Sequence, residues 1–161
     1  MSQATVGRII KSIPKKIALL LPHFIKFPYN SELAEVKRKF YQLAGFPRVI
    51  GAIDCTHVRI KCPAKNVGQE MAGHFLNRKG FYSLNIQIVC DADCKIIDIV
   101  ARSRGSKHDA RIWGECQLKN KLELSKRQHN GVLLGDGGYP LSPILLTPGS
   151  KSLYTQRRKV Q

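Results

Sequence analysis

VIGAID, at residues 49–54, is an apolar run that ends in the carboxylate of Asp54. A second run, VLLGD at residues 132–136, ends in Asp136 in the same way. Short apolar runs of this kind predict buried strands. A carboxylate at the tip of a core strand is partly desolvated, which is costly unless a cation neutralises it. If the sheet places Asp54 beside Asp136, the two side chains can bind a hard divalent cation such as Mg²⁺.

The charge of the chain points to a polyanionic partner. Its 161 residues suffice for about one domain, and 43% of them are hydrophobic. Lys and Arg number 27 against 11 Asp and Glu, and the formal net charge of +16 is spread along the whole chain. Such a surface suits binding along a nucleic acid. The alternative is a basic protein with no polyanionic partner.

The five cysteines form no C-x-x-C pair, and their number is odd. This pattern predicts reduced thiols in an intracellular protein and argues against a zinc site. The longest apolar stretch, at residues 17–21, is too short to cross a bilayer, so no membrane partner is expected.

The N-terminal part of the chain is predicted to be helical. Residues 3–21 have apolar residues at helical spacing, which Pro14 interrupts. Ser31 is expected to cap a second helix that ends at Gly45. The residues expected to face inward from this helix are Leu33, Val36, Phe40 and Leu43.

From residue 48 the pattern changes to strands. The expected strands are residues 49–54, 57–62, 82–90, 95–101 and 131–136, with a hairpin turn at residues 91–94. Residues 108–124 are predicted to form one or two short helices, which bury Ile112, Trp113, Leu118 and Leu122. Residues 149–161 lack periodicity and are expected to form a frayed basic tail.

Four motifs, in this order, resemble the PIF/Harbinger transposases and the Harbinger transposase-derived nucleases. They are GFPRVIGAIDCTHVRIKCP, LNRKGFYSLNIQIVCDADCKI, ARSRGSKHDARIW and LLGDGGYPLSPILLTP. The resemblance covers roughly residues 4–148. It implies an α/β, RNase H-like mixed sheet preceded by a helical segment, with a three-carboxylate site that binds two Mg²⁺ or Mn²⁺ ions.

The resemblance also implies the domain limits and the acids of the site. Residues 1–47 would be a helical segment that links to a lost helix-turn-helix region, residues 48–148 a partial endonuclease core, and residues 149–161 the tail. The first two acids match Asp54 and Asp136, although Gly137 stands where the family has Ser. The third is a Glu on a later helix. No carboxylate follows Asp136 in this sequence, so the C-terminal part of the family core is expected to be missing and turnover weak or absent.

Asp109 admits two interpretations. It lies at the start of a predicted helix, where an acid favours the helix dipole and caps free N–H groups; this is the favoured interpretation. The motif around it also resembles the family's GS-x-HD signature, which makes Asp109 an alternative third metal ligand.

Two basic clusters are predicted to contact the DNA backbone. Arg78 and Lys79 precede a glycine in a loop, where the main chain can approach a phosphate. Arg102, Arg104 and Lys107 lie next to Asp109 in sequence. His57, in contrast, is expected to point to the opposite face of the strand from Asp54 and to be structural.

The leading hypothesis is a metal-dependent DNA nuclease of Harbinger ancestry. The alternative is a non-catalytic DNA-binding or protein-interaction remnant of such a nuclease. A third possibility is that an uncovered sheet face leaves the chain unstable. The resemblance also implies a Myb-like protein partner, and together with the basic charge it implies a nuclear location, with the cytoplasm as a second possibility.

Overall fold

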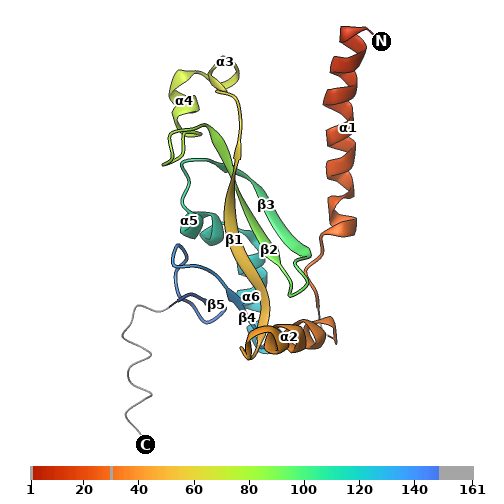
Figure 1. Ribbon diagram of the computed structural model, residues 1–161, viewed down its shortest axis with the longest axis vertical. Coiled ribbons are helices and arrows are strands. Elements are labelled where there is room, and N and C mark those ends of the chain that lie inside the picture. The colour runs from red at the N-terminus through yellow and green to blue at the C-terminus, as the bar shows by residue number, and fades with distance from the viewer. Residues whose placement is uncertain (1, 30, 149–161) are drawn as a thin grey trace, which may run out of the picture.

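The computed structural model describes residues 2–29 and 31–148, so the predicted tail at 149–161 lies outside the described residues. Groups of helices alternate with single strands or pairs of strands along the chain (Figure 1). The elements are α1 (Gln3–Phe24), α2 (Ser31–Ala44), β1 (Val49–Arg59), α3 (Ala64–Val67), α4 (Gln69–Gly73), β2 (Ser83–Cys90), β3 (Ile96–Arg104), α5 (Asp109–Gly114), α6 (Gln117–Leu124), α7 (Lys126–His129), β4 (Val132–Leu134) and β5 (Leu145–Leu146).

The strands form one mixed sheet in the order β3-β2-β1-β4-β5. β1, β2 and β3 are antiparallel neighbours, whereas β4 runs parallel to β1 and β5 runs parallel to β4. β4 runs parallel to β3 but is separated from it by β2 and β1, so the chain must cross over the sheet between them. This connection contains α5, α6 and α7. The expected α/β, RNase H-like fold with N-terminal helices is confirmed.

β1 is one continuous strand, so the prediction of separate strands at 49–54 and 57–62 was wrong. Its partner β2 pairs with it without a break from Ala52↔Cys90 to Arg59↔Ser83. Asp54 therefore lies inside a strand and not at its tip. The strand tolerates this acid because Asp54 points to a solvent-exposed face, while Ile53 on the other face is buried.

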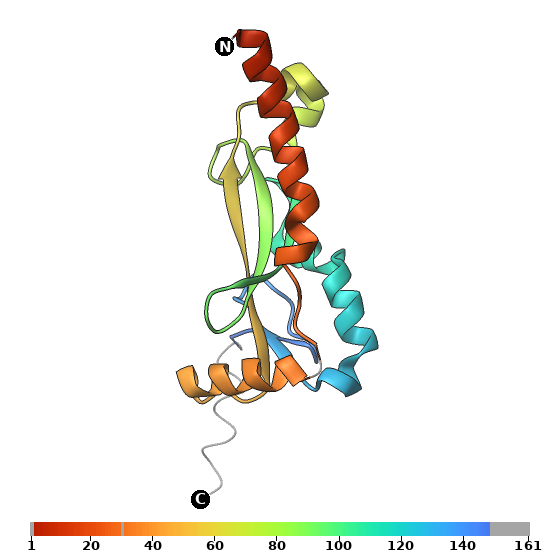
Figure 2. The ribbon, with the colours of Figure 1, turned by 90° about the vertical axis from the view of Figure 1, so that its right-hand side faces the viewer.

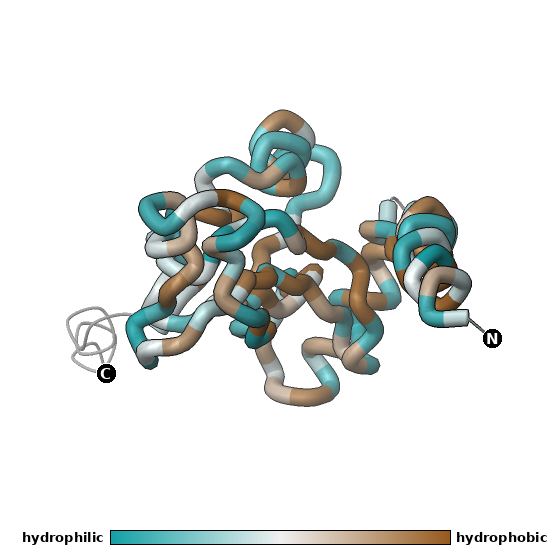
Figure 3. The backbone as a smooth tube through the Cα atoms, turned by 90° about the horizontal axis from the view of Figure 1, so that it is seen from above, coloured by the Kyte–Doolittle hydropathy of each residue, from teal (hydrophilic) through white to brown (hydrophobic). Residues whose placement is uncertain are grey.

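α5 and α6 cover one face of the sheet and supply its core. Ile112, Trp113, Leu118 and Leu122 are buried, as predicted. Trp113, Leu118 and Leu122 belong to the same hydrophobic cluster as Ile53, Val89, Ile97 and Leu133 of the sheet. Seen from above, apolar segments gather in the middle of the molecule (Figure 3). Each such side chain stabilises the fold by about 1.5–3 kcal/mol when fully buried.

The N-terminal helices differ from the prediction in three respects. α1 runs through Pro14 and Pro22 to Phe24, because a proline removes only one main-chain hydrogen bond and both flanks keep helical apolar spacing. None of its side chains is buried, and it projects beyond the sheet (Figure 2). α2 buries Leu33, but Leu43 is 68% exposed because α2 covers only the beginning of β1. Within residues 2–29 and 31–148, no helix is long and apolar enough to span a bilayer.

Candidate active site

The sheet brings the segments that carry Asp54 and Asp136 side by side. β1 and β4 are parallel neighbours, and Ala52 pairs with Leu134. Asp54 and Asp136 each stand two residues further along, and neighbouring strands lie about 4.8 Å apart. The predicted neighbourhood of the two strands is therefore confirmed, although Asp136 follows the end of β4 and is not part of it.

Both carboxylates are exposed and each bonds a nearby main-chain N–H. Asp54 Oδ1 accepts from the N–H of Cys55 at 2.7 Å, and Asp136 Oδ1 accepts from the N–H of Gly138 at 2.9 Å. Among the described residues, no three His, Cys, Asp or Glu side chains are grouped so that they could hold a metal ion. The two acids are oxygen ligands, which suit Mg²⁺ or Mn²⁺ better than a thiophilic metal.

Asp109 approaches Asp136 from the helix-covered side of the sheet. It is the first residue of α5, and its Oδ1 accepts from Asn85 Nδ2 at 2.9 Å. A Cβ placed on Gly138 would lie 3.0 Å from Asp136 Oδ1 and 3.4 Å from Asp109 Oδ2. The glycine therefore separates two converging carboxylates, whereas Asp54 lies on the other face of β1. Asp109 is held by a side-chain amide of β2, so capping is not the main role of its Oδ1.

The thiol of Cys55 and the phenol of Tyr139 form a contact near these acids. Cys55 Sγ and Tyr139 Oη lie 3.1 Å apart. Burial raises the pKa of the Cys55 thiol to about 12; the Tyr139 hydrogen bond opposes this shift, and the charges of Asp109 and Asp54 add to it. Burial is also the main cause that raises the pKa of Tyr139, with further contributions from Cys55 and the same two acids. Both groups are therefore neutral at pH 7, and they contribute packing to the site but no charge.

The predicted basic residues flank the acids. Arg78 and Lys79 are exposed in the turn between α4 and β2, and the buried Asn77 fixes this turn by accepting from the N–H groups of Lys79 and Phe81. The second cluster, Arg102, Arg104 and Lys107, lines a hollow of about 370 Å³ together with His74, His108 and Arg111. Arg78 and Lys107 meet at a smaller hollow that Asp109 also lines. The fold thus brings both predicted clusters to the side of the sheet where Asp109 begins α5.

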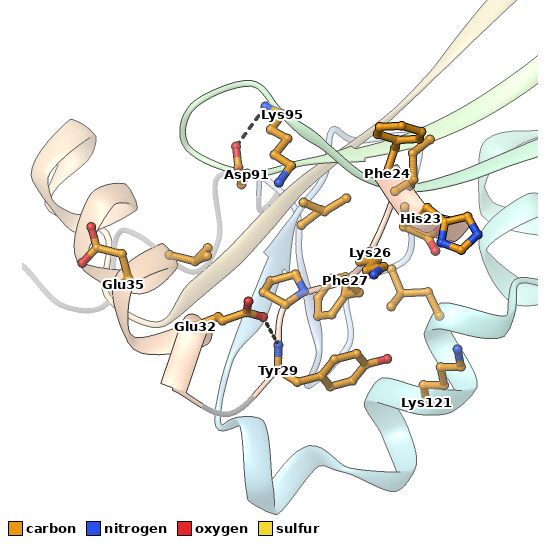
Figure 4. Close-up of a pocket in the computed structure, with 16 residues that line it drawn as sticks. His23, Phe24, Lys26, Phe27, Tyr29, Glu32, Glu35, Asp91, Lys95 and Lys121 are labelled. Atoms are coloured by element: carbon orange, nitrogen blue, oxygen red, sulfur yellow. Dashed lines mark hydrogen bonds between the residues drawn. The ribbon is translucent and has the colours of Figure 1, made fainter. Parts of the chain in front are cut away.

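Two other hollows lie away from this cluster. The open face of β1 and β2 has a shallow apolar hollow of about 300 Å³, lined by Ala52, Asp54, Thr56, Ile88 and Cys90 among others. A hollow of about 690 Å³ lies between the segment after α1, α2, the β2–β3 hairpin and α6 (Figure 4). Its lining includes Lys26, Lys95 and Lys121 as well as Glu32, Glu35 and Asp91, so its charges are of both signs.

The sequence of this chain matches a known family over more than half of its length. Residues 53–161 match the family described as DDE superfamily endonuclease. The chain belongs to the DDE superfamily endonucleases. The predicted resemblance to the Harbinger transposase-derived nucleases is thereby confirmed, because the curated relatives include proteins of that name.

The DDE-family chain is 34% identical over 149 residues to the rat protein "Putative nuclease HARBI1", a match that spans 92% of this chain and 41% of the relative. The human protein of the same name is 32% identical over 149 residues, with the same coverage. "Protein ALP1-like" of Arabidopsis thaliana is 32% identical over 160 residues, spanning 92% of this chain and 38% of the relative. The chain thus spans about two fifths of the length of these relatives. No solved structure gives a significant match.

The sequence did not predict several residues of this DDE-family site. Asn85, which orients Asp109, and Tyr139, which binds Cys55, were not identified. A signal for Asn85 was present, since a polar side chain interrupts the apolar run of β2. His57 was correctly expected to face away from Asp54, and its Nδ1 lies 3.1 Å from the buried Ser83 Oγ.

Proposed function

We propose that this chain binds double-stranded DNA and holds Mg²⁺ or Mn²⁺ between Asp54 and Asp136, as the metal-binding core of a Harbinger-type DNA endonuclease. The observation that supports this most directly is the strand register, in which Ala52 pairs with Leu134 two residues before each acid. Family membership supports the reaction class.

The donor set fits such an ion. Mg²⁺ is commonly held by one or two carboxylates, while waters and substrate phosphates complete its shell. Two acids therefore suffice for binding, although the part of the chain that the structure describes holds no group of three ligands. A bound ion would supply Lewis-acid chemistry at the scissile phosphate. Because Asp54 and Asp109 lie on opposite faces of β1, Asp109 is proposed as an alternative partner of Asp136 for the ion, through its Oδ2, which lies near Gly138 as Asp136 Oδ1 does.

The basic residues position the DNA in this proposal. Arg78 and Lys107 line one hollow with Asp109, Arg102 and Arg104 line a second hollow with Lys107, and Lys79 follows Arg78 in its turn. Contacts of this kind neutralise phosphates and fix the register of the duplex without reading its sequence. DNA affinity should consequently fall steeply as salt rises. From the same resemblance we propose a nuclear location and a Myb-like protein partner.

The test is the nicking of a supercoiled plasmid in Mg²⁺ or Mn²⁺. We expect slow nicking that Asp54→Asn and Asp136→Asn each abolish. Glu123→Gln, an exposed acid on α6, serves as the control and should nick as the parent chain does. Nicking that persists in both site variants would refute the assignment of these acids.

A second candidate is a DNA-binding module without catalysis. The observation that favours it is that no three-ligand group is found among the described residues. This candidate predicts salt-sensitive DNA binding that is the same in the parent chain and in Asp54→Asn, with no nicking by either. The two candidates therefore differ in nicking, and both retain DNA binding.

A further inference from the structure

A small polar hollow lies between the 77–81 turn and the loop that precedes α5. Its volume is about 130 Å³, and His57, Arg78, Lys107, His108 and Asp109 are among the residues that line it. Pockets for drug-sized molecules measure roughly 300–1,000 Å³, so this hollow suits a group no larger than a small anion. Four of these five residues can donate hydrogen bonds or carry positive charge.

A chain of buried hydrogen bonds fixes His57 at this hollow. Asn77 Nδ2 donates to Ser83 Oγ at 3.0 Å, and Ser83 Oγ lies 3.1 Å from His57 Nδ1. Asn77 is 4% exposed and Ser83 is fully buried. Ser83 Oγ accepts from the amide with one lone pair, and we assign its own proton to a hydrogen bond that it donates to His57 Nδ1. The neutral ring then carries its proton on Nε2.

We infer that this hollow binds one phosphate of the DNA backbone, with His57 Nε2–H as a fixed donor and Arg78 and Lys107 as the flanking cations. The inference rests on the proposed DNA substrate and adds a specific contact to it. His57 is therefore a substrate-binding residue and not only a structural one. The strand alternation that points it away from Asp54 is what brings it to the phosphate.

The one acid in the lining does not prevent anion binding. Asp109 Oδ1 already accepts from Asn85 Nδ2, and Asp109 Oδ2 lies 3.4 Å from the place where a Cβ of Gly138 would stand. Lys107 pairs with Glu115 in the free chain. Arg111 Nε also lies 3.2 Å from Glu115, so Glu115 keeps an ionic partner when Lys107 turns toward a phosphate. The bound phosphate would thus lie beside the carboxylate pair at Gly138.

The ring state of His57 can be read by nuclear magnetic resonance of the full chain labelled with ¹⁵N-histidine, in metal-free buffer with EDTA. We expect a neutral Nε2–H ring for His57, whose signals shift saturably with inorganic phosphate. His129 is the matched control, because both of its ring nitrogens already have partners in Leu122 and Gly131. A short DNA duplex should displace the phosphate. A His57 protonated at Nδ1, no response to phosphate, or no displacement by DNA would each overturn the inference.

DNA affinity supplies the second measurement, by fluorescence anisotropy of a labelled duplex in EDTA. His57→Phe should weaken binding roughly tenfold, whereas His57→Gln, which keeps an amide donor, should recover most of that loss. Arg127→Gln on α7 removes a charge that is not part of the hollow and should change affinity far less. Thermal melts of all variants verify folding. If His57→Phe binds as tightly as the parent, the phosphate site is refuted, while the plasmid test of Asp54 and Asp136 stands unaffected because EDTA removes metal here.

Discussion

Asp109 Oδ2 and Asp136 Oδ1 converge on Gly138, at 3.4 Å and 3.0 Å from the place where a Cβ would stand. The two acids come from segments far apart in sequence, the start of α5 and the end of β4. A residue without a side chain between them keeps the space that a shared cation would need. If Asp136 and Asp109 hold the proposed ion, Gly138 is therefore a sensitive position for its binding.

Gly138→Ala should lower affinity for Mn²⁺ about tenfold, because the added methyl group fills the space between the two carboxylates and forces Asp136 Oδ1 to move by a few tenths of an ångström. Stability should change little, since both neighbours are side-chain tips. Isothermal titration calorimetry measures the affinity. The control is Gly137→Ala, where a Cβ meets no atom within 4 Å. Equal affinities in the two variants would contradict a metal between Asp109 and Asp136.

Alkaline pH should destabilise the fold through Cys55. The folded-state pKa of its thiol is about 12, above the usual value of 9.0, so folding favours the protonated form. Its contribution to stability is fully present below pH 9 and is lost as pH rises from 9 toward 12. Urea unfolding across this pH range should show the decline in the free energy of unfolding. Cys55→Ser should change the dependence of that free energy on pH.

Alkylation tests the same thiol without unfolding the chain. Cys55 should stay unmodified by iodoacetamide at pH 8, because the thiolate is the reactive form and it is scarce there. The exposed Cys62 and Cys94 should react within the same period and serve as internal controls. Peptide mapping by mass spectrometry gives the modified positions. Rapid labelling of Cys55 would refute the buried pairing with Tyr139.

Asn77→Ala should cost about 1–3 kcal/mol of stability, because Asn77 is buried and its side chain bonds Ser83 and the N–H groups of Lys79 and Phe81. The substitution leaves these donors and acceptors without a partner. Urea denaturation measures the free energy of unfolding. Asn66→Ala, at an exposed position of α3, is the control and should cost less than about 0.5 kcal/mol.

Gly105→Ala should be among the most damaging single substitutions in this chain. A Cβ at Gly105 would lie 2.3 Å from Ser83 Oγ and 2.4 Å from the carbonyl oxygen of Phe75. The Phe75 oxygen is main chain, so the clash is relieved only by moving the backbone of the segment that follows α4, at a cost of about 1–3 kcal/mol. Gly114→Ala meets no atom within 4 Å and should be neutral or stabilising. A thermal melt of each variant decides between them.

The local pattern of the sequence predicted most of the sheet and its covering helices. Apolar runs bounded by turn residues identified β2, β3 and β4, and the spacing from Ile112 to Leu122 identified the buried side of α5 and α6. The pattern misplaced the end of β1, because Asp54 interrupts the apolar run although the strand continues. Pairing with β2 sustains the strand there, and pairing is not a local property of the sequence.

The candidate site was predictable only in part for the same reason. Asp54 and Asp136 were found because each follows an apolar run, but the convergence of Asp109 and Asp136 depends on how α5 is placed on the sheet. The contact between His57 and Ser83 joins residues on paired strands, Ser83 being the register partner of Arg59. Neither contact can be predicted from the spacing of apolar and polar residues along the sequence.

β1 is bordered by strands unequally along its length. β2 accompanies it from Ala52 to Arg59, whereas β4 accompanies it only from Val49 to Ala52. Past Ala52, the main-chain amides on the β4 side have no neighbouring strand among the described elements, so they should exchange with deuterium quickly while those facing β2 remain slow. In β1, the exchange of amides that face β2 would then report on the integrity of the fold. The exchange of the amides on the other side would report on ligand binding at Asp54.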